Sequence, residues 1–458
     1  MTKRRVTIPR RGFLSAASAA LVAPRWWRGP EGPRGRPVPS PAQLAWQQDE
    51  LALFLHFGVN TFTDREWGDG TENPSVFAPE ALDARQWARA ARAAGFRAMI
   101  LTAKHHDGFC LWPTGTTNHS VVMSPWRSGK GDVMREFVDA CRAEGLKAGV
   151  YLSPWDRHEP SYGDSPRYND LYCEQLTELL TRYGPLNEVW FDGANGEGPN
   201  GRRQVYDWTR IWGLVRTLQP NAVMFSDAGP DVRWIGNEVG VAGETNWSTV
   251  NPAAVPYPGA TGDGVMDMLQ HGDPGGTVWR PGETDVSIRP GWFYHPAEDD
   301  RVKSADRLVD LYFTSVGRNS KLLLNVPPTR AGLLHATDVA RLAGMRRRLD
   351  TLLGEDLAAG RAASWLRTGG STAVAEVDLG RFVEVSIADL REEIAHGQAV
   401  ARYALEGMTR DGWRVLSRGT TIGYRKLDRL PGRSVRRVRL VVEDAIGPPE
   451  PVRIAVYS

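Results

Sequence analysis

Cysteine is scarce in this sequence. Only three of its 458 residues are cysteines, Cys110, Cys141 and Cys173, and their spacing matches no CxxC or other metal-ligand pattern. So small and odd a number excludes a fold that depends on a framework of disulfide bonds. We therefore interpret the three cysteines as small apolar side chains of the core.

Excess charge of either sign is also lacking. The 56 basic and 54 acidic residues give a net charge of +2, and they are spread along the chain without a basic stripe. Proteins that bind nucleic acids concentrate Lys and Arg to neutralise phosphates. The sequence therefore argues against a nucleic-acid partner, and a neutral or weakly charged ligand fits better.

The apolar run near the start of the chain is too short to span a bilayer, and no membrane span is predicted. The first residues, "MTKRRVTIPRRGFLSAASAALVAP", place Arg10 and Arg11 ahead of this weakly apolar run. Paired arginines in this position resemble a twin-arginine (Tat) export signal, which predicts a secreted, periplasmic or cell-surface protein. The Pro/Gly/Arg-rich "RGPEGPRGRPVPSP" then reads as a linker, so the folded part is expected to begin near Pro41.

Aromatic residues, in contrast, are plentiful. The chain has 17 Trp and 12 Tyr. Flat apolar rings that carry a hydrogen-bonding edge suit the CH faces of sugars, although most of these rings are expected in the core. With 41% apolar residues, the chain is long enough to form two or three domains.

Short apolar runs alternate with longer amphipathic ones from residue 51 to residue 328. Near-continuous apolar runs such as "LALFLHFGV" and "FRAMILTA" predict buried parallel strands, and the segments between them predict helices. Seven or eight such units predict an α/β fold, a (β/α)8 TIM-like barrel, with an open doubly wound sheet as the alternative. The stretch 228–284, rich in Gly, Pro and Asp, is expected to be a long irregular insertion.

The pattern changes after about residue 355, where apolar and polar residues alternate in short runs, as in half-buried antiparallel strands. We therefore expect three regions: the export signal and linker over 1–40, the barrel over 41–355, and a C-terminal antiparallel β-sandwich over 356–458.

Polar side chains follow several of the predicted strands. Barrel active sites lie at the carboxyl ends of the strands, so these side chains are expected to share one pocket. Successive side chains of a strand point to opposite faces, so two adjacent histidines face one pocket only where the strand has ended. The residues concerned are His56, His105, His106, Tyr151, Asp192 and Asp227.

Three histidines in one place raise the question of a metal site. Adjacent histidines seldom chelate one ion, and the HxH spacing that puts two imidazoles on one strand face is absent. We expect no metal and no cofactor. Sugar chemistry fits these residues better, because imidazoles bind hydroxyls, aromatic faces bind the ring and a pair of carboxylates cleaves the glycosidic bond.

Six motifs, found in order, carry a family resemblance. They are "HFGVNTF" with "REWGDG", "KHHDGFCLW", "GVYLSPWDRH", "EVWFDGA", "DVRWIGNEVG" and "ETNWST". Over residues 44–355 the chain resembles the family 29 α-L-fucosidases, retaining exo-glycosidases with a barrel and a C-terminal β domain. The sequences of the motifs "TFTDREWGDG", "YLSPWDR" and "GNE" are more similar to the branch that acts on α-1,3 and α-1,4 fucosides of branched glycans than to the broad branch that cleaves simple aryl fucosides.

The resemblance implies roles for two carboxylates. Asp192 in "WFDG" matches the nucleophile, which must stay ionised to attack the anomeric carbon. Glu238 in "GNE" matches the general acid/base, which needs a raised pKa to protonate the leaving oxygen. Glu244 in "GETNW" remains a rival for the acid/base role.

The same motifs imply contacts with the sugar. The three histidines, Tyr151 and Trp67 match residues that hold the hydroxyls or the ring of fucose. Trp292 resembles the aromatic residue that packs against the methyl side of the sugar. Glu66 is a further candidate for binding. The substrate-binding candidates are His56, Glu66, Trp67, His105, His106, Tyr151 and Trp292.

The expected function is release of L-fucose from α-1,3/α-1,4-fucosylated glycans by double displacement, with a fucosylated oligosaccharide or glycoconjugate as the partner. Three alternatives stay open. They are a broad-specificity α-L-fucosidase, a hydrolase of a related sugar such as L-galactose, and a fucose-binding barrel without catalysis. L-Galactose differs from L-fucose by one hydroxyl, which an apolar pocket rejects only weakly. Carboxylates at both catalytic positions favour the enzyme over the last of these.

Overall fold

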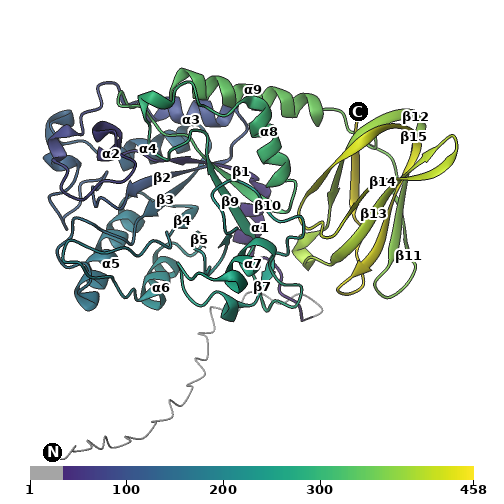
Figure 1. Cartoon of the computed structure of the whole chain (residues 1–458), viewed down its shortest axis with the longest axis horizontal. Helices are drawn as coiled ribbons and strands as arrows, with labels where there is room; N and C mark the ends of the chain where they lie inside the picture. The colour runs from purple at the N-terminus through teal and green to yellow at the C-terminus, as the bar shows by residue number, and fades with distance from the viewer. Residues whose placement is uncertain (1–34) are drawn as a thin grey trace, which may run out of the picture.

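Eight parallel strands of the computed structural model curve into an almost closed barrel (Figure 1). The structure describes residues 35–458, so the predicted export signal lies outside the described residues. The strands follow one another around the barrel in chain order, and a bridge between Phe225 and Val232 links the two edges. The predicted α/β barrel is confirmed. Its strands are β1 (Leu51–Leu55), β2 (Ala98–Lys104), β3 (Lys147–Leu152), β4 (Glu188–Trp190), β5 (Val223–Phe225), β6 (Arg233–Trp234), β9 (Gly282–Ser287) and β10 (Ser320–Asn325).

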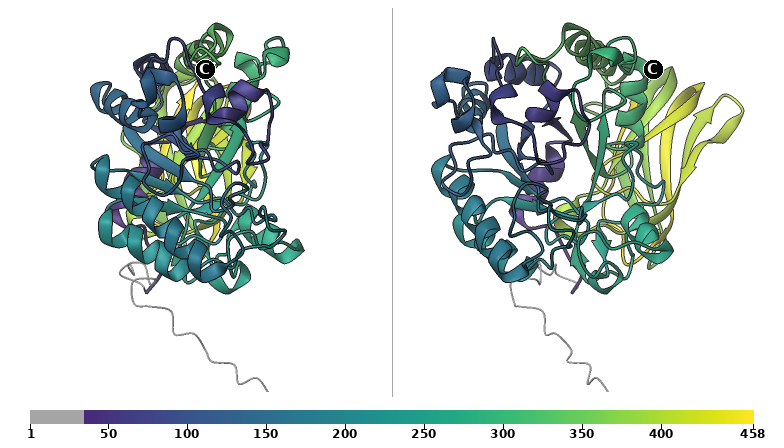
Figure 2. Two further views of the ribbon diagram at one scale, coloured as in Figure 1. Left: turned by 90° about the vertical axis from the view of Figure 1, so that its left-hand side faces the viewer. Right: turned by 60° about the vertical axis from the view of Figure 1, so that its left-hand side comes forward.

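Helices cover the outside of the barrel, and α5 and α6 lie on the side away from the C-terminal domain (Figures 1 and 2). Several begin where an Asp or Ser side chain accepts a backbone N–H of the first turn, as Asp83, Asp132, Asp207 and Ser304 do. Within residues 35–458 no helix is both long and apolar enough to cross a membrane. The helices are α3 (Ala84–Ala93), α4 (Val133–Ala143), α5 (Ser165–Arg182), α6 (Trp208–Leu218), α7 (Asp263–His271), α8 (Ala305–Thr314) and α9 (Ala336–Leu352).

The alternation of side chains along each strand separates two apolar layers. In β1, Leu51, Leu53 and Leu55 pack toward the helices, whereas Ala52 and Phe54 point into the barrel. Both sets are buried, which explains why the strand reads as a continuous apolar run.

A polar cluster lies inside the barrel beneath the site. Helix α1 (Pro41–Gln48) inserts Trp46, whose Nε1 donates to Glu188 Oε2 at 2.8 Å. Lys321 pairs with the same oxygen at 3.1 Å, and Trp190 Nε1 donates to Glu283 Oε1 at 2.9 Å. Burial and the neighbouring Glu188 raise the pKa of Glu283 well above its usual value, so Glu283 is neutral and one lysine balances one carboxylate.

The stretch 228–284 is more ordered than the sequence suggests. It supplies barrel strand β6, helix α7 and the antiparallel pair β7 (Thr249–Val250) and β8 (Val278–Trp279). Strands of two residues are too short to show a period, which is why the expectation of an irregular insertion is wrong. Strand β9 ends at Ser287, so Trp292 lies in the loop that follows the strand.

Short helical segments complete the loops of the barrel. These are α2 (Val59–Thr63), η2 (Pro74–Val76), η3 (Val121–Met123), η4 (Trp126–Gly129), η5 (Pro252–Ala254), η6 (Pro296–Glu298) and, in the C-terminal domain, η7 (Ile394–His396).

The C-terminal domain is built from antiparallel strands around a core of its own. Register shifts in the pairing of β12 with β15, one of them between Val385 and Ile387, bend the sheet. Together with the barrel, this antiparallel domain confirms the predicted fold class. The strands are β11 (Ser364–Arg367), β12 (Ala373–Arg391), β13 (Val400–Thr409), β14 (Gly412–Gly419), β15 (Lys426–Ala445) and β16 (Arg453–Tyr457).

The two units share a packed interface. Ile387, Leu427 and Tyr457 of the C-terminal domain join the apolar layer between the barrel and its helices. Beside them Arg425 forms ion pairs with Glu50 of the barrel, at 2.8 Å, and with Asp389, at 2.7 Å. The C-terminal sheet therefore supports the flank of the barrel.

Candidate active site

The nine residues predicted to be catalytic or substrate-binding line one cleft of about 280 Å³ at the carboxyl ends of the barrel strands. Asp227, also expected in this pocket, does not line it, so that expectation is wrong. The cleft also takes in four residues that the sequence did not single out as binders. Its lining is Phe54, His56, Glu66, Trp67, His105, His106, Tyr151, Trp190, Asp192, Ala194, Glu238, Asp285 and Trp292.

The adjacent histidines both reach the cleft because β2 ends at Lys104, immediately before them. The backbone turns there, with Gly108 N donating to the carbonyl of His105 at 3.0 Å. The rings of His105 and His106 lie 4.1 Å apart at an angle of 37°. The strand thus ends directly before the two histidines, as predicted from their adjacent positions in the sequence.

The hydrogen bonds of His106 determine its tautomer. Ser153 Oγ donates its proton to the carbonyl of Trp155 at 2.6 Å and lies 2.7 Å from His106 Nδ1. Ser153 must therefore accept from Nδ1–H, which leaves Nε2 of the neutral ring as an acceptor. This Nε2 lies 3.9 Å from Asp192 Oδ2.

His56 is held in the same way. Asn325, at the end of β10, donates through Nδ2 to Ser287 Oγ at 2.9 Å and to the carbonyl of Trp292 at 2.8 Å. Its Oδ1 consequently accepts from His56 Nδ1–H at 2.8 Å. The other ring nitrogen of His56 is then an acceptor, and the ring lines the cleft.

All three imidazoles are neutral. Burial lowers the pKa of His56 to about 3, and burial is also the main reason why the pKa values of His105 and His106 are lowered. Neutral rings offer the acceptors that sugar hydroxyls need. Over residues 35–458, no group of three or more His, Cys, Asp or Glu side chains is placed to hold a metal ion.

Asp192 is anchored from two sides. It follows β4, and its Oδ2 accepts from the hydroxyl of Tyr151 at 3.0 Å while its Oδ1 accepts from the backbone N–H of Ala194 at 2.7 Å. Hydrogen bonds to a carboxylate favour its ionised form. The carboxylate is partly open to solvent, with 28% of its side chain exposed.

Glu238 has the opposite electrostatic environment. Burial raises its pKa, and the charges of Asp192 and Glu66 raise it further, while a hydrogen bond from the Trp292 side chain partly offsets the rise. The two carboxylates of the cleft therefore differ: Asp192 accepts two hydrogen bonds and is partly open to solvent, whereas burial and neighbouring charges raise the pKa of Glu238.

The loops that close the cleft are tied together by Glu66. Its Oε1 accepts from the backbone N–H of Trp292 at 2.5 Å, and its Oε2 lies 3.0 Å from His295 Nε2. Trp67, next in the chain, is 59% exposed and approaches the ring of Trp155 edge-on at 6.3 Å. Glu66 thus positions the loop of Trp292, and Trp67 forms an aromatic rim.

Known proteins resemble this chain over nearly its whole length. The model of the family described as alpha-L-fucosidase matches residues 38–351. Alpha-L-fucosidase 1 of Arabidopsis thaliana is 44% identical over 439 residues, which cover 89% of this chain and 85% of the plant protein. This chain belongs to the alpha-L-fucosidase family.

Solved structures support the same assignment. The crystal structure of SpGH29 superimposes with a TM-score of 0.86 at 39% identity, covering 92% of this chain and 98% of that one. A Ruminococcus gnavus GH29 fucosidase in complex with fucose gives 0.84 at 31% identity, covering 94% and 96%. The protein is an α-L-fucosidase, a glycoside hydrolase, as predicted.

One cleft residue of this fucosidase escaped the sequence reasoning although it is a carboxylic acid. Asp285 lies in β9, buried, and accepts from Trp234 Nε1 at 2.8 Å. Burial and the charge of Glu238 raise its pKa well above the usual value. Its position in "GETDVS" is inside a strand rather than after a strand end, so the strand-end pattern does not indicate it.

Glu244 is absent from the cleft of the fucosidase. It lies between the barrel and the C-terminal domain, its side chain is 78% exposed, and it pairs with Arg318 at 3.0 Å. This placement removes Glu244 as the rival acid/base.

Proposed function

We propose that the fucosidase retains the anomeric configuration, with Asp192 as nucleophile and Glu238 as general acid/base. The observation that carries the proposal is the pairing of these two carboxylates in one cleft with opposite electrostatic environments. In the first step Glu238 protonates the leaving oxygen while Asp192 attacks the anomeric carbon. In the second, Glu238 removes a proton from water, which attacks the same carbon and releases Asp192.

We assign the neutral imidazoles to the hydroxyls of fucose. The acceptor nitrogens of His56 and His106 follow from their bonds to Asn325 and Ser153, so each imidazole can accept from a sugar hydroxyl without a change of protonation. The ring of Trp292, 5.1 Å from that of His56, is assigned to the apolar methyl side of the sugar.

We further propose a preference for α-1,3 and α-1,4 fucosides of branched glycans. A second branch sugar needs exposed aromatics at the rim, and Trp67 and Tyr257 are each 59% exposed. Trp247 and Trp279, also within 228–284, are buried and cannot contribute to this subsite. The alternative is a broad-specificity enzyme.

The mechanism is tested by product analysis. Proton NMR of the first product should show α-L-fucose, and initial β-fucose would refute double displacement. Azide should rescue Asp192→Ala as β-fucosyl azide, because it attacks opposite the leaving group, and Glu238→Ala as α-fucosyl azide, because it intercepts the fucosyl enzyme. The same anomer from both variants would overturn the assignment.

Export through the Tat route is a separate proposal. It rests on Arg10 and Arg11 before the weakly apolar run. Replacing both by lysine should leave the enzyme in the cytoplasm, as measured by fucosidase activity in cell fractions. Undiminished export of this variant would refute the proposal.

A further inference from the structure

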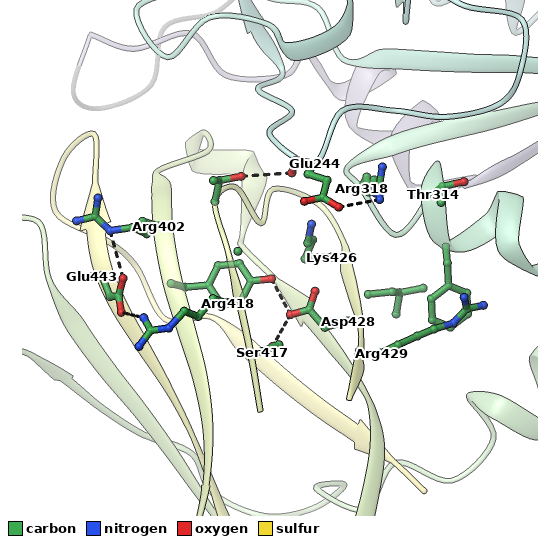
Figure 3. Close-up of a pocket in the computed structure, with 15 residues that line it drawn as sticks. Glu244, Thr314, Arg318, Arg402, Ser417, Arg418, Lys426, Asp428, Arg429 and Glu443 are labelled. Atoms are coloured by element: carbon green, nitrogen blue, oxygen red, sulfur yellow. Dashed lines mark hydrogen bonds and ion pairs between the residues drawn. The ribbon is translucent and has the colours of Figure 1, made fainter. Parts of the chain in front are cut away.

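A second cleft, larger than the active site, lies between the barrel and the C-terminal domain (Figure 3). Its volume of about 600 Å³ lies within the range of small-molecule sites, about 300–1,000 Å³. It is lined by Thr314 and Arg318 of the barrel, which come before β10, and by residues of β13, β14 and β15. It therefore lies toward the amino-terminal ends of the barrel strands, whereas the active site lies at their carboxyl ends.

Charge in this cleft is unbalanced. Five cationic and three acidic side chains line it. Glu443 is shared by Arg402 and Arg418, and Glu244 is taken by Arg318. The remaining cations, Arg429 and Lys426, find no carboxylate partner among the lining residues. Arg429 pairs instead with Asp310, outside the cleft, at 2.6 Å.

Lys426 differs from the other four cationic residues of the cleft. It is 7% exposed, and no hydrogen bond or ion pair joins its ammonium group to any side chain or carbonyl of residues 35–458. Its neighbour Arg425 points to the ion pairs of the domain interface, so alternation along the strand turns Lys426 to the other side. Figure 3 shows Lys426 between the Glu244–Arg318 pair and Asp428.

The ammonium of Lys426 lines the cleft without being sealed from solvent, so a group bound in the cleft can reach it. Burial lowers the pKa of Lys426, and Asp428 and Glu244 only partly oppose this effect. An anionic group bound in the cleft would supply the missing partner.

The carboxylate of Asp428, two residues from Lys426 on β15, suits hydroxyl groups. Asp428 Oδ2 accepts from the hydroxyls of Tyr403 and Ser417, both at 2.7 Å. Its Oδ1 accepts no hydrogen bond from the described part of the chain. A carboxylate oxygen repels a simple anion but accepts from a hydroxyl, so the cleft combines a donor for a negative group with an acceptor for an alcohol.

We infer that this interdomain cleft binds an acidic sugar unit, a saccharide ring that carries a carboxylate or a sulfate, with the anion on Lys426 and a hydroxyl on Asp428. The site is separate from the fucose cleft and shares none of its lining residues. It gives the fucosidase a means of holding an acidic glycan while the active site works on its fucose.

Calorimetric titration of the full chain, saturated with L-fucose to occupy the active site, tests this inference. D-Glucuronate and D-galactose 6-sulfate should bind with 1:1 stoichiometry, and D-galactose and inorganic sulfate at least ~10-fold more weakly. The two acidic sugars distinguish a carboxylate site from a sulfate site. Failure of both to bind, equal binding of galactose, or equal binding of inorganic sulfate would overturn the inference.

Variants connect binding to the cleft. Lys426→Met should weaken the acidic sugar at least ~10-fold, while Lys426→Arg keeps the charge and the affinity. Lys130→Met, at an exposed lysine elsewhere, is the matched control. Ser417→Glu, which adds a negative charge without touching Lys426, should also abolish binding. Hydrolysis of an aryl fucoside should be unchanged in these variants, and unaltered sugar affinity in Lys426→Met would contradict the site.

Discussion

At the scale of single residues, the proposed mechanism requires one carboxylate of the cleft to be charged while another is protonated. Glu66 contributes to that difference, because its charge is one of the causes that raise the pKa of Glu238. The general acid must be protonated, so activity falls as the pH rises through its pKa. A lower pKa of Glu238 would therefore move the loss of activity to lower pH.

Glu66→Gln tests this coupling. Its remaining carbonyl oxygen can still accept from Trp292 N–H, but the negative charge is gone, so the basic limb of the kcat/KM profile should move to lower pH. Glu298→Gln is the matched control, because Glu298 holds the same loop through Gly291 N–H and is not among the groups that shift Glu238. A limb that stays in place or moves upward in Glu66→Gln would contradict Glu238 as the acid.

Much of the residue-level site follows from sequence, because strand ends and family motifs both point to it. His105 and His106 are examples: the apolar run ends just before them, and the structure places both in the cleft. Asn325 and Ser153, which determine the tautomers, could not be predicted. Their partners come from other strands, and no local pattern records such pairings.

At the scale of elements, strands that bury both faces can be predicted from the sequence, whereas very short strands cannot. The run 51–55 is apolar at every position and was predictable as β1. Strand β6 has two residues and is too short to show a period, and the short helix α7 lies among glycines, which are typical of loops. The sequence also could not show which aromatic residues of 228–284 are buried and which are exposed. Burial of Trp279, for example, depends on the distant Gln47, whose side-chain oxygen accepts from Trp279 Nε1–H at 3.0 Å.

The loop of Tyr257 gives a prediction at this scale. Gly259 has φ +82°, and a Cβ there would lie 2.2 Å from the carbonyl oxygen of Gly193, next to Asp192. Its N–H also donates to Asp227 Oδ2 at 2.8 Å. Gly259→Ala must displace the loop or the backbone beside Asp192, the proposed nucleophile, and misplacement of about 1 Å costs roughly 100-fold in rate.

We expect kcat/KM for an aryl fucoside to fall roughly 10- to 100-fold in Gly259→Ala, with the melting temperature as a check on the fold. Gly264→Ala is the control, because a Cβ at Gly264 meets nothing within 4 Å. Equal activity of the two variants would show that the loop does not position Asp192.

At the scale of the whole molecule, the barrel and the C-terminal domain depend on a buried ion pair between them. Arg425 is nearly enclosed and faces both Glu50 and Asp389. Arg425→Met leaves the two carboxylates with Arg391 alone, at 3.6 Å from Glu50 and 3.0 Å from Asp389, so one negative charge loses its partner. This loss costs about 3–5 kcal/mol in the free energy of unfolding. Urea denaturation of the full chain measures the loss.

The control for Arg425→Met is Arg210→Met, which breaks an exposed pair with Asp170 and should change the free energy of unfolding by less than about 1 kcal/mol. Similar losses in the two variants would mean that the ion pairs of Arg425 contribute no more to the free energy of unfolding than an exposed ion pair does. The sequence alone could not indicate this pair, since Glu50 and Arg425 come from opposite ends of the folded chain.

Linkage preference also belongs to the whole molecule, because it depends on groups far from the reacting bond. Binding energy from a remote branch sugar can be used at the reacting centre. The exposed rings of Trp67 and Tyr257 come from separate loops of the barrel, and the second loop packs on Gly193 beside Asp192. A branched glycan that reaches both rings gains contacts that an aryl fucoside lacks.

We therefore expect kcat/KM for a branched α-1,3 or α-1,4 fucoside to exceed that for an aryl fucoside or a 2'-fucosyl glycan by at least ~100-fold, or about 2.7 kcal/mol. Chromatography of products from the three substrates measures the ratios. Tyr257→Ala should lower the rate on the branched glycan and leave the aryl fucoside unaffected, because only the former extends to the rim. Comparable rates on all three substrates would identify a broad-specificity enzyme and leave Tyr257 without this role.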